Sequence, residues 1–332
     1  MGPMNLHRIR SVPLLVAAAV VTTTVVAATV LVPAAAGASR PTSIGGASAP
    51  PKVDCTNTPR VVRNVPYDAV AGVDPNLLSV DLYLPTTGKG CDPVPLVVGV
   101  HGGGWRKGDK GSFTGDKAKL FNEQGWAFAS VNYRLSDATT RPFVQYPTHN
   151  QDVANSVGFL VDHSKQYGID PEQVGILGHS AGAGIVAAVA TDEQFLENAG
   201  LGLDALQCAF PDDTEGFDIA ARIANGGLPA RLYQFVFGTD PVGWTEASPI
   251  SHVERGKDIP PMLLTQRGEP SRVAQLQSFA DKLRGAGVDV QVIDATGYSH
   301  MDVNELIGST TDTVMTKAVT AFFDRCFTKG AL

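Results

Sequence analysis

The apolar positions of the chain follow two periods, the two-residue period of a half-buried strand and the 3.6-residue period of a helix. Between residues 147 and 167, Val153, Val157 and Leu160 recur at helical spacing, which predicts an amphipathic helix that ends at Gly168. Short apolar runs bounded by Gly, Pro, Asn or Asp predict strands. These strands cover residues 60–68, 77–84, 96–100, 127–131, 174–177, 206–210, 262–265 and 288–293. The other predicted helices cover residues 116–124, 185–190, 272–284 and 313–323.

The order of these elements predicts the fold class. Segments 60–68 and 77–84 flank the turn sequence Asp74-Pro75-Asn76, so we expect an antiparallel hairpin. From residue 96 onward, strands alternate with helices, which is typical of an α/β fold whose parallel sheet has helices on both faces. We expect one such domain over residues 53–328.

The N-terminus has the pattern of an export signal. Arg8 and Arg10 precede an uncharged stretch, residues 11–39, that is rich in Ala, Val, Leu and Thr and ends in small residues. We predict a signal peptide at residues 1–38, a flexible Pro- and Ser-containing leader at residues 39–52, and a secreted mature protein. The alternative is a retained membrane anchor, since about 20 apolar residues can span a bilayer.

The chain has four cysteines, an even number that is compatible with two disulfides in an exported protein. We expect the pairs Cys55–Cys91 and Cys208–Cys326, with four free thiols as the alternative. The absence of a CxxC pair or a His-rich cluster argues against a zinc site.

The net charge of −7 and the lack of a basic run argue against nucleic acid or an anionic membrane surface as a partner. A small diffusing substrate is therefore favoured.

The motif Gly178-x-Ser180-x-Gly182 lies between a predicted buried strand and a helix of small residues. This context is that of a nucleophile elbow, in which a serine occupies a tight turn and flanking glycines avoid collisions. We predict that Ser180 is a catalytic nucleophile; the alternative is a structural glycine-rich turn.

A second glycine-rich segment, His101-Gly102-Gly103-Gly104-Trp105, directly follows the strand predicted at residues 96–100. Consecutive glycines let backbone N–H groups approach an oxyanion where a Cβ would block them. A phosphate-binding loop is the alternative, but the Lys-Ser or G-x-G-x-x-G pattern of such loops is missing.

The two motifs, about 75 residues apart, resemble those of α/β-hydrolase esterases of the hormone-sensitive-lipase-like type and of the feruloyl-esterase and kynurenine-formamidase branch. The resemblance covers about residues 52–327. It implies an eight-stranded, mostly parallel sheet and cofactor-free, metal-free hydrolysis of a small-molecule ester. It also implies that the N–H groups of Gly103, Gly104 and Ala181 form the oxyanion hole. Further matching segments are Asn132-Tyr133-Arg134-Leu135, the helix containing Asp152, and Tyr167-Gly168-Ile169-Asp170-Pro171.

The general base must follow Ser180 if the order Ser, acid, His holds, which leaves His252 and His300. His300 follows the last predicted strand, where this fold returns a histidine to the elbow, so we predict that it is the base. His252 precedes the penultimate strand and is expected at the surface.

The acid is where the sequence departs from the family. The resembling esterases have a His-Gly-x-x-Asp turn, whereas this chain reads Arg267-Gly268-Glu269-Pro270-Ser271, with Ser271 in the position of the Asp. We predict Glu269 as the acid, because it lies in the same loop and has a longer side chain. Asp213 is the alternative, as is a dyad without an acid.

These observations predict a secreted serine esterase with Ser180, His300 and Glu269 as catalytic residues. Two other functions remain open. One is an arylformamidase or amidase with the same catalytic groups, and the other is a non-catalytic binding protein on a hydrolase scaffold.

Overall fold

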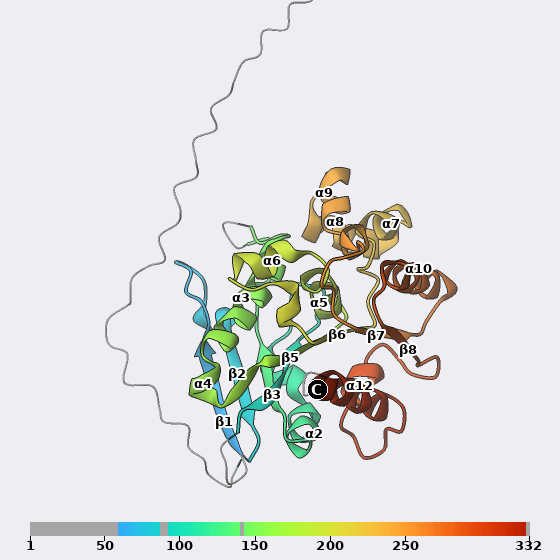
Figure 1. Ribbon diagram of the computed structural model, residues 1–332. Coiled ribbons are helices and arrows are strands. Elements are labelled where there is room, and N and C mark those ends of the chain that lie inside the picture. The colour runs from blue at the N-terminus through green and yellow to red at the C-terminus, as the bar shows by residue number, and fades with distance from the viewer. Residues whose placement is uncertain (1–58, 87–91, 140–142, 330–332) are drawn as a thin grey trace, which may run out of the picture. The chain divides into compact units, whose positions relative to one another are not determined.

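The computed structural model describes residues 59–86, 92–139 and 143–329 (Figure 1). The predicted signal peptide, the leader, Cys55 and Cys91 lie outside the described residues, so those predictions stay predictions. Within the described ranges, no helix is both long and apolar enough to cross a membrane.

The centre of the fold is an eight-stranded sheet with the order β1-β2-β4-β3-β5-β6-β7-β8. The β1–β2 and β2–β4 pairs are antiparallel, and all later pairs are parallel. The strands are β1 (Arg60–Pro66), β2 (Ser79–Leu84), β3 (Val94–Val100), β4 (Ala127–Val131), β5 (Ile169–His179), β6 (Cys208–Asp212), β7 (Met262–Gln266) and β8 (Val290–Asp294).

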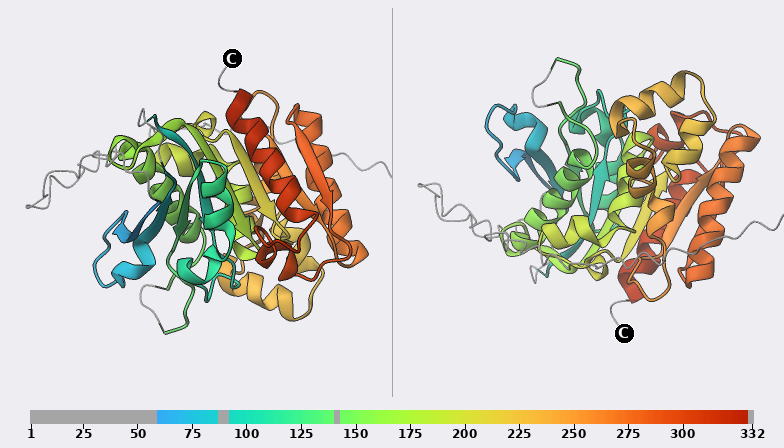
Figure 2. Two further views of the ribbon diagram at one scale, coloured as in Figure 1. Left: turned by 90° about the horizontal axis from the view of Figure 1, so that it is seen from below. Right: turned by 90° about the horizontal axis from the view of Figure 1, so that it is seen from above.

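Helices cover both faces of the sheet (Figures 1 and 2). In Figure 1, α2 and α12 lie on one face, while α3, α5 and α10 lie on the other. The α-helices are α1 (Lys110–Thr114), α2 (Lys117–Glu123), α3 (Thr148–Asp162), α4 (Ser164–Tyr167), α5 (Ala181–Val189), α6 (Glu193–Asn198), α7 (Ile219–Ala224), α8 (Gly227–Phe237), α9 (Pro241–Glu246), α10 (Pro270–Ala286), α11 (Asp302–Glu305) and α12 (Met315–Lys329). Short 3-10 helices cover Pro75–Leu78, Leu203–Ala205 and Pro249–His252.

The alternation of strand side chains divides the core into two layers. Val98, Ile176 and Leu264 belong to the cluster under α3, α5 and α10. Val97 and Leu177, each next to one of these residues in its strand, belong to the cluster under α2 and α12. Because successive strand residues point to opposite faces, a sheet covered on both sides needs these almost continuously apolar strands.

The structure confirms the predicted α/β-hydrolase fold class and its eight-stranded, mostly parallel sheet. Gly168 ends the predicted helix in the left-handed conformation, with a φ of 71°, although a break at His163 divides that helix into α3 and α4. The predicted strand 206–210 begins and ends two residues later, at Cys208–Asp212. Helices α7, α8 and α9 between β6 and β7 were not predicted.

Candidate active site

Ser180 lies in the turn between β5 and α5, in a strained backbone conformation with a φ of 58° and a ψ of −116°. The glycines on each side are required by close packing. A Cβ on Gly178 would lie 2.4 Å from the Gly182 carbonyl oxygen, and one on Gly182 would lie 2.3 Å from the Val100 carbonyl oxygen. The elbow therefore cannot accept side chains at either position without moving backbone.

The loop after β3 presents free backbone donors beside this serine. Gly103 has a φ of 110°, and a Cβ there would lie 1.9 Å from the Lys107 carbonyl oxygen. In the part of the chain that the structure describes, the N–H groups of Gly103 and Gly104 donate to no backbone carbonyl. The N–H of Ala181 belongs to the first turn of α5, where helical N–H groups have no partner within the helix.

Aromatic packing holds the glycine-rich loop. The Trp105 ring makes edge contacts with Tyr233 and Phe237 on α8, each with a centroid distance of 5.2 Å. The Tyr133 hydroxyl donates to the His101 carbonyl at 2.9 Å, and the two rings stack. These contacts hold both ends of the glycine-rich loop against its neighbours.

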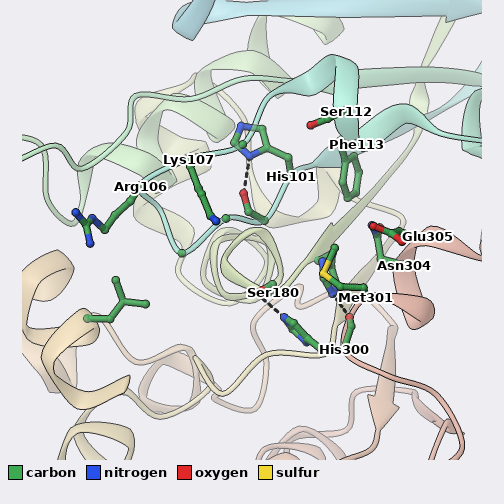
Figure 3. Close-up of a pocket in the computed structure, with 16 residues that line it drawn as sticks. His101, Arg106, Lys107, Ser112, Phe113, Ser180, His300, Met301, Asn304 and Glu305 are labelled. Atoms are coloured by element: carbon green, nitrogen blue, oxygen red, sulfur yellow. Dashed lines mark hydrogen bonds between the residues drawn. The ribbon is translucent and has the colours of Figure 1, made fainter. Parts of the chain in front are cut away.

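His300 connects the serine to a carboxylate. Its Nε2 lies 3.0 Å from Ser180 Oγ, and its Nδ1 lies 2.6 Å from Asp213 Oδ2. Figure 3 shows the Ser180 and His300 side chains pointing toward each other. When Nδ1 carries the ring proton, it donates a hydrogen bond to the Asp213 carboxylate. Nε2 then has a free lone pair that can accept the serine proton.

The predicted role of Glu269 at His300 is wrong, because Asp213 occupies the Nδ1 side of the ring. Gly268, with a φ of 83°, turns the chain after β7, so that Glu269 becomes the exposed residue directly before α10. β6 instead continues to Asp212, and Asp213 follows with a φ of 53° that directs the chain away from the sheet. The carboxylate at the His300 ring is therefore that of Asp213, the alternative candidate, which follows the strand before β7.

Three of the four non-glycine residues with positive φ in the described chain belong to this site: Trp105, Ser180 and Asp213. Such conformations cost about 1–3 kcal/mol each and persist only where the surrounding structure holds them. The strained residues therefore lie in the glycine-rich loop, in the turn at Ser180 and in the turn at Asp213.

Two arginines contact the carboxylate of Asp213. Arg267 Nη1 donates to Oδ2 at 2.5 Å, and Arg272 Nη2 donates to Oδ1. Burial by itself raises the pKa of Asp213, but the hydrogen bond from His300 and the charge of Arg272 outweigh burial and lower the pKa to about 2. Asp213 is therefore ionised at neutral pH.

His179, the residue before Ser180, contacts both the backbone and the ring of His300. Its Nε2 lies 2.7 Å from the His300 carbonyl oxygen, and its ring packs on the His300 ring at 4.6 Å. Burial lowers the pKa of His179 to about 3, so a neutral ring donates to this carbonyl. The other candidate base, His252, contacts the Glu246 carbonyl, away from this group.

Two buried titratable residues, Asp212 and Lys117, lie near Ser180 and Asp213. The Asp212 carbonyl accepts from the Ser180 N–H at 3.0 Å, which joins the ends of β5 and β6. The Asp212 side chain is fully buried, which raises its pKa, and it accepts from the Thr265 hydroxyl at 2.6 Å. Burial also lowers the pKa of the nearby Lys117 to about 8.

The reacting groups open into a cavity of about 840 Å³ that contacts the glycine-rich loop, Ser180 and His300. Figure 3 shows Arg106 and Lys107 on one side of it and Met301, Asn304 and Glu305 on the other. This volume is in the range typical of pockets for small-molecule ligands. The apolar lining residues Phe113, Leu232 and Met301 were not predicted from the sequence, because they come from α1, α8 and the turn before α11.

His179, Asp213 and His300 also offer three metal-ligand atoms within 4.8 Å of one another. Both carboxylate oxygens, both ring nitrogens of His300 and Nε2 of His179 are already in hydrogen bonds. Arg267 and Arg272 beside the carboxylate would also repel a cation. The group is better suited to proton transfer than to metal binding.

The sequence is similar to those of proteins that are named as esterases. The family model BD-FAE matches residues 80–221. The chain is 31% identical over 242 residues to a probable isoprenylcysteine alpha-carbonyl methylesterase of Arabidopsis thaliana, covering 68% of this chain and 48% of that protein. It is 26% identical over 200 residues to the probable carboxylic ester hydrolase LipM of Mycobacterium tuberculosis, covering 57% and 45%. The chain thus spans about half the length of these curated relatives.

Solved structures show the same fold. Esterase B from Lactobacillus rhamnosis has a TM-score of 0.66 at 20% identity, covering 82% of this chain and 88% of that chain. A truncated carbohydrate esterase from gut microbiota also has a TM-score of 0.66 at 20% identity, covering 83% and 98%. The resemblance to esterases inferred from the motifs is therefore confirmed.

Proposed function

We propose that this α/β-hydrolase, which resembles the hormone-sensitive-lipase-like esterases, hydrolyses small-molecule carboxylic esters through an acyl-enzyme on Ser180. The observation that carries the proposal is the continuous hydrogen-bonded chain from Asp213 through His300 to Ser180, which opens into a cavity beside the glycine-rich loop. This arrangement of nucleophile, base and acid performs acyl transfer without a cofactor.

In the acylation step, Ser180 Oγ attacks the ester carbonyl carbon while His300 Nε2 takes the hydroxyl proton. Asp213 stabilises the resulting imidazolium and keeps the Nδ1 tautomer in place. When the tetrahedral intermediate collapses, His300 returns the proton to the departing alcohol. Water then attacks the acyl-enzyme with His300 again as base, and the acid product leaves.

The proposed oxyanion donors are the N–H groups of Gly103, Gly104 and Ala181. They have no backbone acceptor in the described structure, and the glycines let them approach a substrate oxygen. Loss of one such donor in a hydrolase costs about 3 kcal/mol of transition-state stabilisation. Donors that are held in position before substrate binds need little reorganisation during the reaction.

The proposal is tested with p-nitrophenyl esters of increasing acyl length and with a fluorophosphonate that labels activated serines. We expect ester turnover and a single phosphonate adduct on Ser180, mapped by peptide mass spectrometry. Ser278→Ala, at an exposed position on α10, is the matched control and should keep the wild-type rate. No turnover of any ester would contradict the proposal.

An arylformamidase or amidase would use the same residues, so the same assay includes N-formyl amides and anilides. Similarity to relatives named as esterases supports ester hydrolysis as the main activity. A kcat/KM for an N-formyl amide above that of every ester would reassign the substrate class. The non-catalytic alternative rested on the missing acid at residue 271, and Asp213 at the His300 ring removes that reason.

We also propose that the protein is exported and cleaved before about residue 39. The basic start, the uncharged apolar stretch and the small-residue end support this. Intact mass and N-terminal sequencing of the protein from the culture medium test it, and a cell-bound product with residues 1–38 attached would favour the anchor.

The predicted Cys208–Cys326 disulfide is not formed in this structure, where both residues are free, buried thiols. They lie on β6 and α12, and burial together with the neighbouring Cys326 thiol raises the pKa of Cys208. We propose that an oxidising compartment closes this pair, with a disulfide donor accepting the two electrons and two protons. Peptide mapping without reductant should find the cross-link, whereas two alkylatable thiols in exported protein would contradict it.

A further inference from the structure

The carboxylate of Asp213 is contacted by two arginines in addition to the histidine that a triad acid orients. Oδ2 accepts from both His300 Nδ1 and Arg267 Nη1, and Oδ1 accepts from Arg272 Nη2. The Arg267 and Arg272 side chains are only 15% and 19% exposed, and that of Asp213 is 3% exposed. These ion pairs are therefore much less screened by water than surface pairs.

The two arginines lie at either end of the segment in which the acid was expected. Arg267 directly follows β7, and Arg272 lies in the first turn of α10. Arg267 is further fixed by donation from Nε to the Tyr298 carbonyl at 3.1 Å, two residues before His300. Two arginines that follow β7 thus contact Asp213, which follows β6.

We propose that Arg267 and Arg272 are positioning residues that hold the Asp213 carboxylate against His300 and offset its negative charge. This role rests on the proposed hydrolase activity of Ser180. A carboxylate without these partners attracts the imidazolium more strongly, so the base becomes protonated at higher pH. We therefore expect the acid limb of the rate profile to lie at higher pH in a variant that lacks the charge of either arginine.

Other charged groups around the pair bear on the same limb. His179 on β5 packs on His300, and its low pKa leaves it neutral. Glu215, after β6, pairs with Arg272 Nη1 at 2.9 Å and with Arg222 of α7 at 3.3 Å. Asp212 on β6, Lys117 on α2 and Asp302 on α11 are further titratable groups near the pair, and Arg106, Lys107 and Glu305 line the same cavity as His300. Because these groups are the same in every variant below, a difference between variants reports the arginine that was changed.

The experiment compares kcat/KM for p-nitrophenyl butyrate from pH 4 to pH 9 in the full chain. In Arg267→Gln we expect the midpoint of the acid limb to rise by about one pH unit and kcat at the optimum to fall about tenfold. Arg272→Gln should move the limb in the same direction. Arg267→Lys keeps the charge but not the forked geometry, so its limb should stay near that of the wild type while kcat falls. Arg284→Gln, on α10 but paired with Asp281, is the charge-matched control and should not shift the profile.

Thermal unfolding of each variant checks that it is folded. If kcat falls in both glutamine variants but the acid limb does not move, the arginines have only a structural role and the proposal is wrong. A limb that moves to lower pH would also contradict the proposal. We also measure how the rate of phosphonate labelling of Ser180 depends on pH. This measurement distinguishes failure of the arginine proposal from failure of the proposed esterase function. If no ester is hydrolysed but the labelling limb shifts, the arginine role stands and the substrate class is wrong. If esters are hydrolysed and neither limb shifts, the arginine role is wrong.

Discussion

The carboxyl ends of β3 and β5 differ from those of β6 and β7 in how the sequence specifies them. The first two place the glycine-rich loop and the nucleophile, whose function depends on backbone conformation. Only glycine fits at Gly178 and Gly182 without collision, so the motif is visible in the sequence. The carboxyl ends of β6 and β7 precede Asp213 and Arg267, whose contacts depend on the directions in which their side chains point. A carboxylate can reach His300 from more than one strand end, and no local pattern selects among them.

The largest expected effect on activity comes from removing the Ser180 hydroxyl. Ser180→Ala should lower kcat for p-nitrophenyl butyrate by about 10⁵–10⁶-fold, because removal of a triad nucleophile leaves only oxyanion stabilisation and binding. The thermal midpoint should change little, since the side chain is small. A residual rate above one per cent of the wild type would remove Ser180 from the mechanism.

The two candidate acids give the next largest effect. Asp213→Asn should lower kcat about 10⁴-fold with little change in KM, because the imidazole loses its tautomer control and the stabilising charge. Glu269→Gln is the matched control and should stay within about twofold, since Glu269 is exposed and His300 binds Asp213. The reverse ranking of the two variants would return the acid to the loop after β7.

A substitution in the glycine-rich loop tests the backbone half of the comparison. Gly103→Ala places a Cβ 1.9 Å from the Lys107 carbonyl oxygen, so the loop must move and we expect kcat to fall about 10²–10³-fold. The control is Gly125→Ala, which has a similarly positive φ of 81° but open space around its Cβ. It should cost about 1 kcal/mol of stability and leave kcat unchanged. Equal rates in the two variants would show that the loop supplies no oxyanion donors.

The smallest effect is on stability in acid. Asp213 has a pKa of about 2 in the folded protein, below the ordinary value of 3.8. The stability that it contributes is therefore fully present above about pH 4 and is lost as pH falls through 2. Denaturant unfolding should show that the wild type loses about 2 kcal/mol more than Asp213→Asn between pH 4 and pH 2. Parallel losses in the two proteins would mean that the carboxylate is not stabilised in the folded state.

Much of the fold was predictable because each buried strand must present apolar residues to two helical layers. All eight predicted strands are present, and the hairpin around Asp74-Pro75-Asn76 forms as expected. The errors have physical causes. β6 includes Pro211 and Asp212, residues that β-propensity disfavours, so its end was placed too early. Helices α7 and α9 have six residues each, too few to show a clear helical period, whereas α8 has 11 residues and was missed although its length is that of an ordinary helix.

By itself, the sequence predicted that Ser180, His300 and the glycine-rich loop lie together, because each follows a recognisable strand. Glycine is also required for steric reasons around Ser180 and in the loop. Only the tertiary structure showed which carboxylate contacts His300. Asp213 and Glu269 are both carboxylates that follow a strand, and they differ in the direction that the chain takes next. Gly268 turns Glu269 into solvent, whereas the strained turn at Asp213 places its carboxylate 2.6 Å from His300 Nδ1. That choice depends on contacts between residues 87 positions apart in the chain, which no local pattern records.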